Sequence, residues 1–519
     1  MKKIFFGNKS GTSGTPFWQP WGFMGCMGRL LGFLLLLLLL LSLLGLFRKC
    51  QRGDDSRESG SDPVAEWRRP IEGGEDVGLP SPEDNVMPPF EELEPVPSPD
   101  DDGISEIYPN LLYVILDSGV DDEAFLKFAK AFTSMYPAPA HRICSYSTGS
   151  KTLVLEVPEN RRDEICRELP ARIPDVEFMV VPIEVMAMSE SSVSRDTTAV
   201  SVPPSWHLLP IQAYDAWEVT QGSPDVIVGI VDSYMDLEHP SLRGGRCIYP
   251  YSVINGDADV SPRGSDPDIF GHGTMVTSIA VGNPVSEVGI SGIAPRCKYI
   301  PVSVGDCLNT VTLVEGLLYC MYHGASVINL SCGVVLSGVG ALPLEWQIRL
   351  AEQTKIQNEK VWDYVFGLAD KHNVTIVWSA GNYSCLSAVD ASKRNHNTII
   401  VSAVDTLLRR ADFSNFGNFE EYHLSESTIS APGVKVRGAL PGRSFGEWDG
   451  TSFSAPIITG TVALLKSRND SLTTPQIIEI LKATGTPTVG TPEIGGLVQI
   501  KDALDMADAY AARGSETER

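Results

Sequence analysis

The sequence predicts an α/β protein in which helices cover both faces of a parallel sheet, preceded by a small α+β module. In the second half of the chain, strand-like runs such as Val226–Val231 alternate with helical segments, as they do in parallel sheets. Ahead of them, residues 111–188 show a βαββαβ pattern typical of a ferredoxin-like module. At 519 residues the chain is long enough for both parts.

The N-terminal region indicates a membrane anchor. Residues 1–29 are basic and contain no acidic residue, and Leu30–Phe47 is an uncharged apolar run closed by Arg48 and Lys49. This run is just long enough to span a bilayer and is longer than a usual signal-peptide core. We therefore expect a single transmembrane helix at 30–47, with a cleaved signal peptide and a secreted product as the alternative. Basic residues flank both ends, so charge does not set the orientation.

Residues 48–110 are rich in Pro, Asp and Glu and contain few aliphatic residues. Such a segment buries too little apolar surface to offset its ordering entropy, so we expect an unstructured linker. Much of the formal net charge of −24 lies in this segment, and its acidity is not evidence for a cationic substrate. The folded part has no basic stripe, so we expect no nucleic-acid partner.

The remaining elements follow from hydrophobic periodicity. In the module, the pattern predicts strands and helices in the order Leu111–Leu116, Asp121–Met135, His141–Tyr146, Thr152–Val157, Glu159–Leu169 and Val176–Val181. A polar linker at 189–203 leads to a domain over 204–510, and 511–519 is expected to be a disordered tail. The strands expected in that domain are Val226–Val231, Tyr299–Val304, Ser326–Leu330, Thr375–Ser379 and Ile399–Ala403.

The stretch Gly450-Thr451-Ser452-Phe453-Ser454-Ala455-Pro456 precedes an apolar run that predicts a buried helix. We expect Pro456 in its first turn. Ser452 would then lie at the helix N-terminus, where free N–H groups and the helix dipole favour negative charge. Such a tripeptide is more often an ordinary helix cap, so partners elsewhere in the chain must decide.

Two such partners precede Ser452 in the chain. Asp232 ends the buried strand Val226–Val231, and His272 lies in Gly271-His272-Gly273-Thr274. A serine nucleophile needs an imidazole to accept its proton and a carboxylate to orient that imidazole. The order Asp, His, Ser is that of subtilisin. With DSYMDLEHP (232–240), GHGT (271–274), SAGN (379–382) and GTSFSAP (450–456) in this order, the chain resembles the subtilase family of serine proteases.

This resemblance implies a subtilisin-like catalytic domain at 204–510. It also implies that the 111–188 module is an inhibitory propeptide whose C-terminal tail lies in the active site, with 189–203 as the segment where the two separate. Asn382 would donate its side-chain amide to the oxyanion hole. Ser331, Cys332 and Gly333 would form one edge that pairs with substrate backbone, and Ser379, Ala380 and Gly381 the other.

The chain also departs from the family pattern. Tyr234 stands where relatives usually have Gly. Ser241 stands where an Asp that ligates calcium is common, and Asn283–Ile290 matches the calcium loop poorly. We therefore name no metal ligand. Calcium is the one cofactor that the resemblance leaves open, and its usual ligand pattern is poor here. Six Cys fall in the catalytic region, and sequence alone does not give their pairing.

Together these observations predict a membrane-anchored serine endopeptidase made as a zymogen. Its partners would be protein or peptide substrates, its own propeptide, and the membrane through Leu30–Phe47. We expect the catalytic domain to lie outside the cytoplasm, because a protease kept silent by a propeptide suits export. A catalytically silent subtilase-like binding module on a stalk is the alternative, but all four chemical positions are filled, which favours an enzyme.

Overall fold

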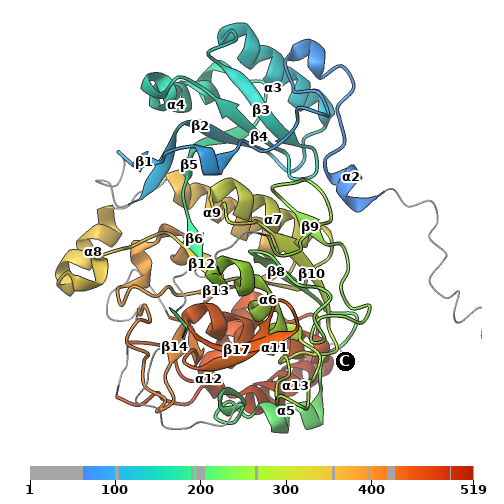
Figure 1. Cartoon of the computed structure of the whole chain (residues 1–519), viewed down its shortest axis with the longest axis vertical. Helices are drawn as coiled ribbons and strands as arrows, with labels where there is room; N and C mark the ends of the chain where they lie inside the picture. Colours follow the sequence, from blue (N-terminus) through green and yellow to red (C-terminus); the bar gives the residue numbers. More distant parts are fainter. Residues whose placement is uncertain are drawn as a thin grey trace, which may run out of the picture. The chain divides into compact units, whose positions relative to one another are not determined.

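Within the residues it describes, the computed structural model is built around a sheet of seven strands, which confirms the predicted fold class (Figure 1). The strand order is β15-β14-β13-β11-β8-β10-β9. All neighbouring strands are parallel, so their carboxyl ends meet at one edge. The strands are β8 (Ile227–Asp232), β9 (Tyr251–Ser252), β10 (Lys298–Ser303), β11 (Val327–Leu330), β13 (Thr375–Ser379), β14 (Thr398–Val404) and β15 (Ile429–Pro432). The sequence does not predict β9 and β15, because such short runs carry little periodicity.

Helices cover both faces of this sheet. α7 (Thr310–Tyr322) and α9 (Gln357–Lys371) pack on one face, and α6 (Pro267–Val281) and α11 (Thr451–Arg468) on the other (Figure 1). α11 is buried from Thr451 to Lys466, because the sheet, α6 and α13 surround it. The other α-helices that the structure describes in this domain are α5 (Ala213–Val219), α8 (Leu344–Gln353), α12 (Thr474–Thr484) and α13 (Ile500–Thr517).

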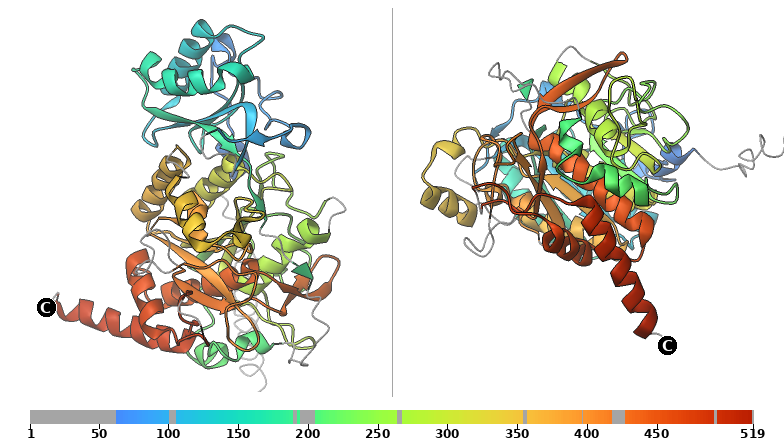
Figure 2. Two further views of the ribbon diagram at one scale, coloured as in Figure 1. Left: turned by 90° about the vertical axis from the view of Figure 1, so that its left-hand side faces the viewer. Right: turned by 90° about the horizontal axis from the view of Figure 1, so that it is seen from below.

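The C-terminal end differs from the prediction. A disordered tail over 511–519 is wrong for residues 511–517, because α13 continues without a break to Thr517 (Figure 2). This stretch, Ala-Ala-Arg-Gly-Ser-Glu-Thr, contains the good helix formers Ala, Arg and Glu beside the poorer Gly, Ser and Thr. Once the preceding turns are fixed by packing, extending a helix costs little.

Residues 106–184 form a βαββαβ module. Its elements are β2 (Glu106–Leu116), α3 (Asp122–Met135), β3 (Arg142–Ser147), β4 (Thr152–Glu156), α4 (Arg162–Arg172) and β5 (Phe178–Glu184). The strands pair antiparallel in the order β5-β2-β4-β3. Leu112 and Val114 of β2 face the module's own core with Phe128, whereas Tyr113 and Ile115 belong to the core of the large domain. β2 therefore reads as a continuous apolar run, because both of its faces are buried.

The unstructured linker predicted for 48–110 is wrong for residues 106–110, which belong to β2, and for residues 62–99. The latter form α2 (Pro63–Trp67), two 3-10 turns, η1 (Glu75–Val77) and η2 (Phe90–Glu92), and the short strand β1 (Val96–Pro97), which pairs with β2. Val64, Trp67, Ile71, Leu79 and Phe90 are buried. Low aliphatic content prevents a segment from forming a core of its own, but widely spaced apolar side chains suffice when other elements supply the surface.

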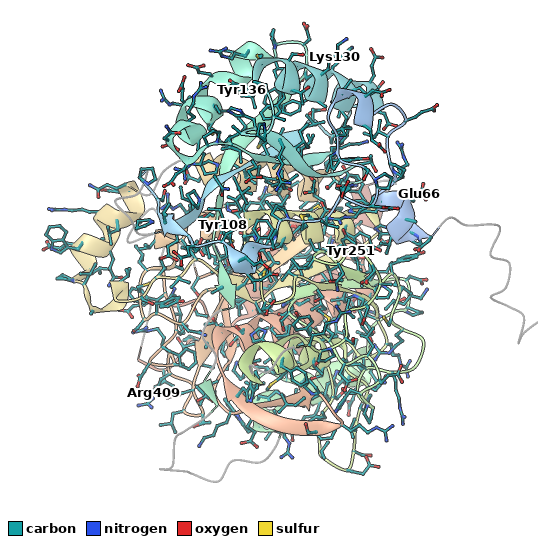
Figure 3. All side chains as sticks on the ribbon, turned by 45° about the horizontal axis from the view of Figure 1, so that its top comes forward. Glu66, Tyr108, Lys130, Tyr136, Tyr251 and Arg409 are labelled. Carbon is teal, nitrogen blue, oxygen red and sulfur yellow. The ribbon has the colours of Figure 1, made fainter. Side chains whose placement is uncertain are left out.

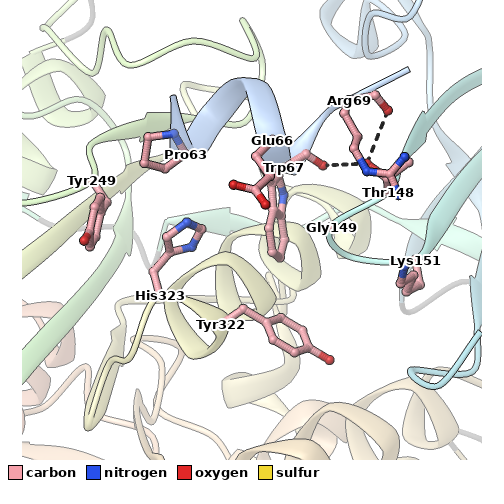
Figure 4. Close-up of a pocket in the computed structure, with 10 residues that line it drawn as sticks. All are labelled: Pro63, Glu66, Trp67, Arg69, Thr148, Gly149, Lys151, Tyr249, Tyr322 and His323. Carbon is pink, nitrogen blue, oxygen red and sulfur yellow. Dashed lines mark hydrogen bonds between the residues drawn. The ribbon is translucent and has the colours of Figure 1, made fainter. Parts of the chain in front are cut away.

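Trp67 makes the most specific of these contacts. Its Nε1 donates to Oε1 of Glu315 on α7 at 2.7 Å, and its ring meets that of Tyr319 edge to face. Figure 4 shows Trp67 with His323 and Tyr322 in a pocket of about 490 Å³ between α2 and α7. None of the residues that line this pocket is a predicted site residue.

Two strand pairs follow the module. β6 (Ala187–Met188) pairs antiparallel with β12 (Cys332–Gly333). β7 (Ser192–Val193) pairs with β17 (Ser444–Asp449), which also pairs with β16 (Val436–Leu440). The polar linker predicted at 189–203 thus contains a short paired strand.

Asp62–Arg519 is one compact unit, separate from residues 1–61. The basic segment 1–29, the apolar run Leu30–Phe47 and the start of the linker lie outside the described residues. No helix in the described part is long and apolar enough to cross a membrane. The structure describes residues 62–99, 105–188, 192–193, 205–263, 267–353, 357–395, 397–417, 427–490 and 493–517.

Candidate active site

The three predicted catalytic residues lie on three elements that meet near the carboxyl end of β8. Asp232 is the last residue of β8, His272 lies within α6, and Ser452 is the second residue of α11. α6 and α11 pack against each other on the same face, and the His272 ring lies 5.5 Å, centre to centre, from that of Phe453, the residue after Ser452. All three side chains are fully buried. In open parallel sheets, sites form at the carboxyl ends of the strands, where Asp232 lies.

His272 and Asp232 make a short hydrogen bond. The Nδ1 to Oδ1 distance is 2.7 Å, and the same oxygen accepts from the Ser233 backbone N–H at 2.7 Å. His272 Nε2 has no hydrogen-bond partner among the described residues. If Asp232 is ionised, Nδ1 must carry the proton. The Nε2 lone pair is then available to accept one.

Gly273 permits this close approach. A Cβ atom there would lie 2.6 Å from the Tyr234 carbonyl oxygen and 3.2 Å from Asp232 Oδ1. Its N–H donates to Ser233 Oγ at 3.1 Å, which ties α6 to the end of β8. Tyr234, the bulky residue at a position where relatives usually have Gly, is accommodated with its side chain partly exposed.

Ser452 follows Gly450, which has a φ of +155° that favours glycine. The Ser452 hydroxyl donates to the Ser331 carbonyl oxygen at 3.3 Å, not to His272. A hydroxyl hydrogen bond of this kind breaks and reforms by rotation about one bond. Catalytic hydrogen bonds are often loose before substrate binds.

Pro456 lies in the second turn of α11, so the expectation of a first-turn proline is wrong. Proline has no N–H, so the Ser452 carbonyl loses its usual helical donor. Ser331 Oγ donates to this carbonyl at 2.9 Å instead. Ser331 and Ser452 therefore exchange two hydrogen bonds, and this link depends on the proline.

Asn382 follows β13 and faces the start of α11. Its Oδ1 accepts from Thr451 N–H at 2.9 Å and from Thr451 Oγ1 at 2.8 Å. With the oxygen fixed in this way, the amide nitrogen turns toward Gly450, whose missing Cβ leaves room for it: a Cβ there would lie 3.3 Å from Asn382 Nδ2. An amide donor thus lies beside the helix N-terminus that carries Ser452.

The two predicted substrate edges differ. Cys332 and Gly333 pair with β6 of the same chain, so part of the first edge is already covered. On the second edge, Ala380 N–H donates to Val401 O and Gly381 N–H to Thr451 Oγ1. Ser379 pairs with β14. No described segment pairs with this second edge as a substrate would.

Asn283, the first residue of the stretch that matches the calcium loop poorly, bonds within the protein. Asn283 donates its amide to the Pro240 and Arg243 carbonyls, and its Oδ1 accepts from Arg246 at 2.8 Å. A guanidinium at that oxygen opposes a cation. Among the described residues, no cluster of three His, Cys, Asp or Glu could hold a metal.

The six cysteines of this domain are all free thiols, so none of them forms a disulfide. Burial raises the pKa of the Cys332 thiol to about 12. Its thiolate is therefore suppressed, and Cys332 is an inert member of the edge rather than a reactive thiol.

Sequence reasoning missed two contributors to this site. Thr451 fixes the Asn382 amide, and the Ser331 side chain replaces the bond that Pro456 removes. The first has a weak signal, since Thr451 lies in the GTS motif itself. The second has none, because the pairing joins residues far apart in sequence.

Comparisons with known proteins point in one direction. A family model described as the subtilase family matches residues 223–498. A thermophilic serine proteinase from Bacillus sp. (strain AK1) is 29% identical over 256 residues, 49% of this chain and 55% of that protein. Subtilisin E from Bacillus subtilis (strain 168) is 27% identical over 271 residues, 50% of this chain and 61% of that protein. The chain thus spans less than two thirds of the length of these relatives.

One solved structure supports the fold. Fervidolysin from Fervidobacterium pennivorans, a keratinolytic enzyme related to subtilisin, aligns with a TM-score of 0.56 at 20% identity. The alignment covers 76% of this chain and 61% of that one. At this identity the likeness concerns the fold alone.

Proposed function

Because this chain belongs to the subtilase family, we propose that it is a subtilisin-like serine endopeptidase that uses Asp232, His272 and Ser452. The observation that carries the proposal is the 2.7 Å bond between buried His272 and Asp232, placed beside the helix N-terminus that holds Ser452. The substrates are proteins or peptides.

In the proposed reaction, the Ser452 hydroxyl turns from the Ser331 carbonyl to His272 Nε2 and attacks the scissile carbonyl. His272 takes the proton and passes it to the leaving amine as the C–N bond breaks, while Asp232 stabilises the imidazolium. Water, with His272 as its base, then hydrolyses the ester formed on Ser452 and frees the serine. Negative charge develops on the carbonyl oxygen. The Asn382 amide and the first N–H groups of α11 stabilise it.

The protein is proposed to be made as a zymogen. β6 lies on the β12 edge and β7 lies on β17, which ends just before Gly450-Thr451-Ser452. The chain that leaves the 111–188 module therefore pairs first with β12 and then with the end of β17, which is close in sequence to Ser452. This arrangement supports a propeptide whose tail competes with substrate, as in other subtilases.

The zymogen is further proposed to be anchored in a membrane by Leu30–Phe47, with the acidic residues after it as a spacer. The length of the run and its lack of charge support this. The anchor carries no part of the catalytic argument.

A fluorophosphonate probe tests the activity. The full-length protein, cut by itself or by trypsin after Arg195 and then separated from the cut module, should be labelled, whereas Ser452→Ala should not be labelled and should remain uncut at 189–203 in the absence of trypsin. If wild-type protein separated from the module takes no label, the chain is a silent binding module. If Ser452→Ala is processed at the normal rate without added protease, maturation is not autocatalytic.

A further inference from the structure

A buried ion pair lies behind the first substrate edge. Lys393 and Asp390 are almost fully buried, with Lys393 Nζ 3.9 Å from Asp390 Oδ2. Nζ donates to the Cys332 carbonyl oxygen at 2.9 Å and lies 3.8 Å from the centre of the Trp378 ring. The Trp378 indole N–H donates to the same carbonyl at 2.6 Å. The cation is thus fixed against the edge that β6 covers.

The register of β6 shows which substrate side chains face this pair. A Cβ atom on Gly333 would lie 2.9 Å from Asp390 Oδ2 and 3.6 Å from Lys393 Cε, so the pair lies on the Cβ side of Gly333. Residues directly opposite in an antiparallel pair project to the same face, and alternate residues share that face. The residue of a bound peptide opposite Gly333 therefore points toward the pair. A peptide that continued the same pairing past Cys332 would turn its residue opposite Ser331 to the same side.

The residue opposite Ser331 is the one beside the nucleophile, because the Ser331 carbonyl oxygen lies 3.3 Å from Ser452 Oγ. In the register of β6, Gly333 faces Ala187 and Cys332 faces Met188. A peptide bound as Ala-Met-Xaa would then place Xaa opposite Ser331. Xaa is the residue whose carbonyl Ser452 reaches.

The two charges of the pair are not equally satisfied. Asp390 Oδ1 accepts from the Ser392 N–H and hydroxyl, and Oδ2 accepts from the Val334 N–H. Lys393 Nζ has three N–H donors, and the Cys332 carbonyl is the one hydrogen-bond acceptor recorded for them among the described residues. A further acceptor that reached the ammonium would gain a charge-assisted hydrogen bond without displacing Asp390.

We propose that Lys393 gives the active site a preference for a carboxylate side chain, Glu above all, at the residue opposite Ser331. The proposal rests on the endopeptidase function proposed above. Lys393 acts here as a specificity residue, because it binds the substrate side chain and takes no part in proton transfer. A lysine serves as a compact cation that rejects a basic substrate side chain at the same position.

The preference also has a pH dependence. Burial lowers the pKa of Lys393 to about 8, with Asp390 and Cys332 opposing the shift. These are the ionisable groups recorded as facing it, and the Cys332 thiol stays neutral because burial raises its pKa to about 12. The preference should therefore be full below the pKa of Lys393 and fade as pH rises through it.

The test compares Ala-Met-Xaa peptides with a coumarin amide leaving group, where Xaa is Glu, Gln, Leu or Lys. The processed protein, separated from the cut module so that β6 no longer covers the edge, should show a kcat/KM for Glu about tenfold or more above that for Gln near pH 6.5, falling toward equality near pH 10. Catalytic groups act on both peptides, so their own titration cancels in the ratio. Lys393→Met should reduce the ratio to about one.

Lys466→Met is the matched control. Lys466 is also buried, with a pKa lowered by burial to about 8, but it lies at the other end of α11 and donates to Asn373 O. It should leave the Glu to Gln ratio unchanged. Equal cleavage of Glu and Gln peptides by wild type would overturn the inference, as would a ratio that is constant with pH. If no peptide is cut and the fluorophosphonate probe does not label Ser452, the proposed function itself fails.

Discussion

Ser331 and Ser452 exchange two hydrogen bonds, and we expect the loss of the Ser331 hydroxyl to lower the stability of the protein. Ser331→Ala leaves the buried Ser452 carbonyl without a donor, because Pro456 cannot supply one. An unsatisfied buried carbonyl costs about 1–3 kcal/mol. We expect the unfolding free energy to fall by that amount, measured by urea denaturation in a Ser452→Ala background that keeps the chain intact.

Pro456→Ala provides the control for this experiment. It restores an N–H that can donate to the Ser452 carbonyl, so Ser331→Ala should cost clearly less in that background. If Ser331→Ala lowers the unfolding free energy equally with and without Pro456, the Ser331 hydroxyl does not compensate for the N–H that proline lacks.

Asn382 supports a kinetic prediction at the same scale. Its amide nitrogen is used mainly when negative charge develops on the substrate carbonyl, so Asn382→Ala should reduce kcat with little change in KM. The expected loss is roughly 10²–10³-fold, a magnitude that comes from subtilisin itself and not from this chain. Thr451→Ser, which keeps the hydroxyl bonded to Asn382 Oδ1, should stay near wild type. A rise in KM alone would contradict the assigned role.

At the scale of elements, residues 62–99 are part of the folded structure. Val64, Trp67 and Phe90 belong to the same core as the central sheet. Glu315 on α7 is fully buried, and its Oε1 accepts from Trp67 Nε1 and from Tyr251 OH, which β9 supplies. Figure 3 labels Tyr251 and Glu66, the residue that precedes Trp67 in the sequence. The second oxygen of Glu315 has no hydrogen-bond partner in the described part of the chain.

We therefore expect Trp67→Phe to destabilise the intact chain by about 1.5–3 kcal/mol, the usual worth of a hydrogen bond to a charged group. Denaturation of the Ser452→Ala protein would measure this. In a Glu315→Gln background the same change should cost less, because the acceptor is weaker. Identical costs in the two backgrounds would mean that packing of the ring, not the indole bond, holds α2 to α7.

The prediction of elements succeeded where a segment's own pattern decides its structure. Val226–Val231 and Thr375–Ser379 form strands within a residue of the expected bounds, since buried parallel strands read as continuous β-branched runs. Residues 62–99 were misread because their burial depends on surfaces supplied by α7 and β2. Lys393 was missed for a related reason: nothing in Asp390-Ala391-Ser392-Lys393 distinguishes a buried lysine from a solvated one.

On the scale of the whole molecule, the module and the large domain are held together by a shared hydrophobic core. Tyr113 and Ile115 of β2 and Trp67 of α2 all enter the core that contains α7. A cut between residues 189 and 203 would therefore not by itself free the module. β6 and β7 both pair with strands of the large domain, and these pairs would help to hold the module after cleavage at Arg195.

The topology of the full chain gives the last prediction: Leu30–Phe47 stays in the mature protein and holds the catalytic domain outside the cytoplasm. The length and lack of charge of the run favour spanning. The described cysteines are free thiols and lend export no support through disulfides. The propeptide-like module supports export, since a silenced precursor suits a protease that acts elsewhere. Protease shaving of intact cells, with antibodies against residues 1–29 and against the 204–510 domain, should digest the domain and spare the N-terminal segment. Permeabilised cells, in which both should be digested, provide the control.

A protected catalytic domain with a digested N-terminal segment would reverse the orientation. A catalytic domain found only in the medium, without the 30–47 run, would establish a cleaved signal peptide.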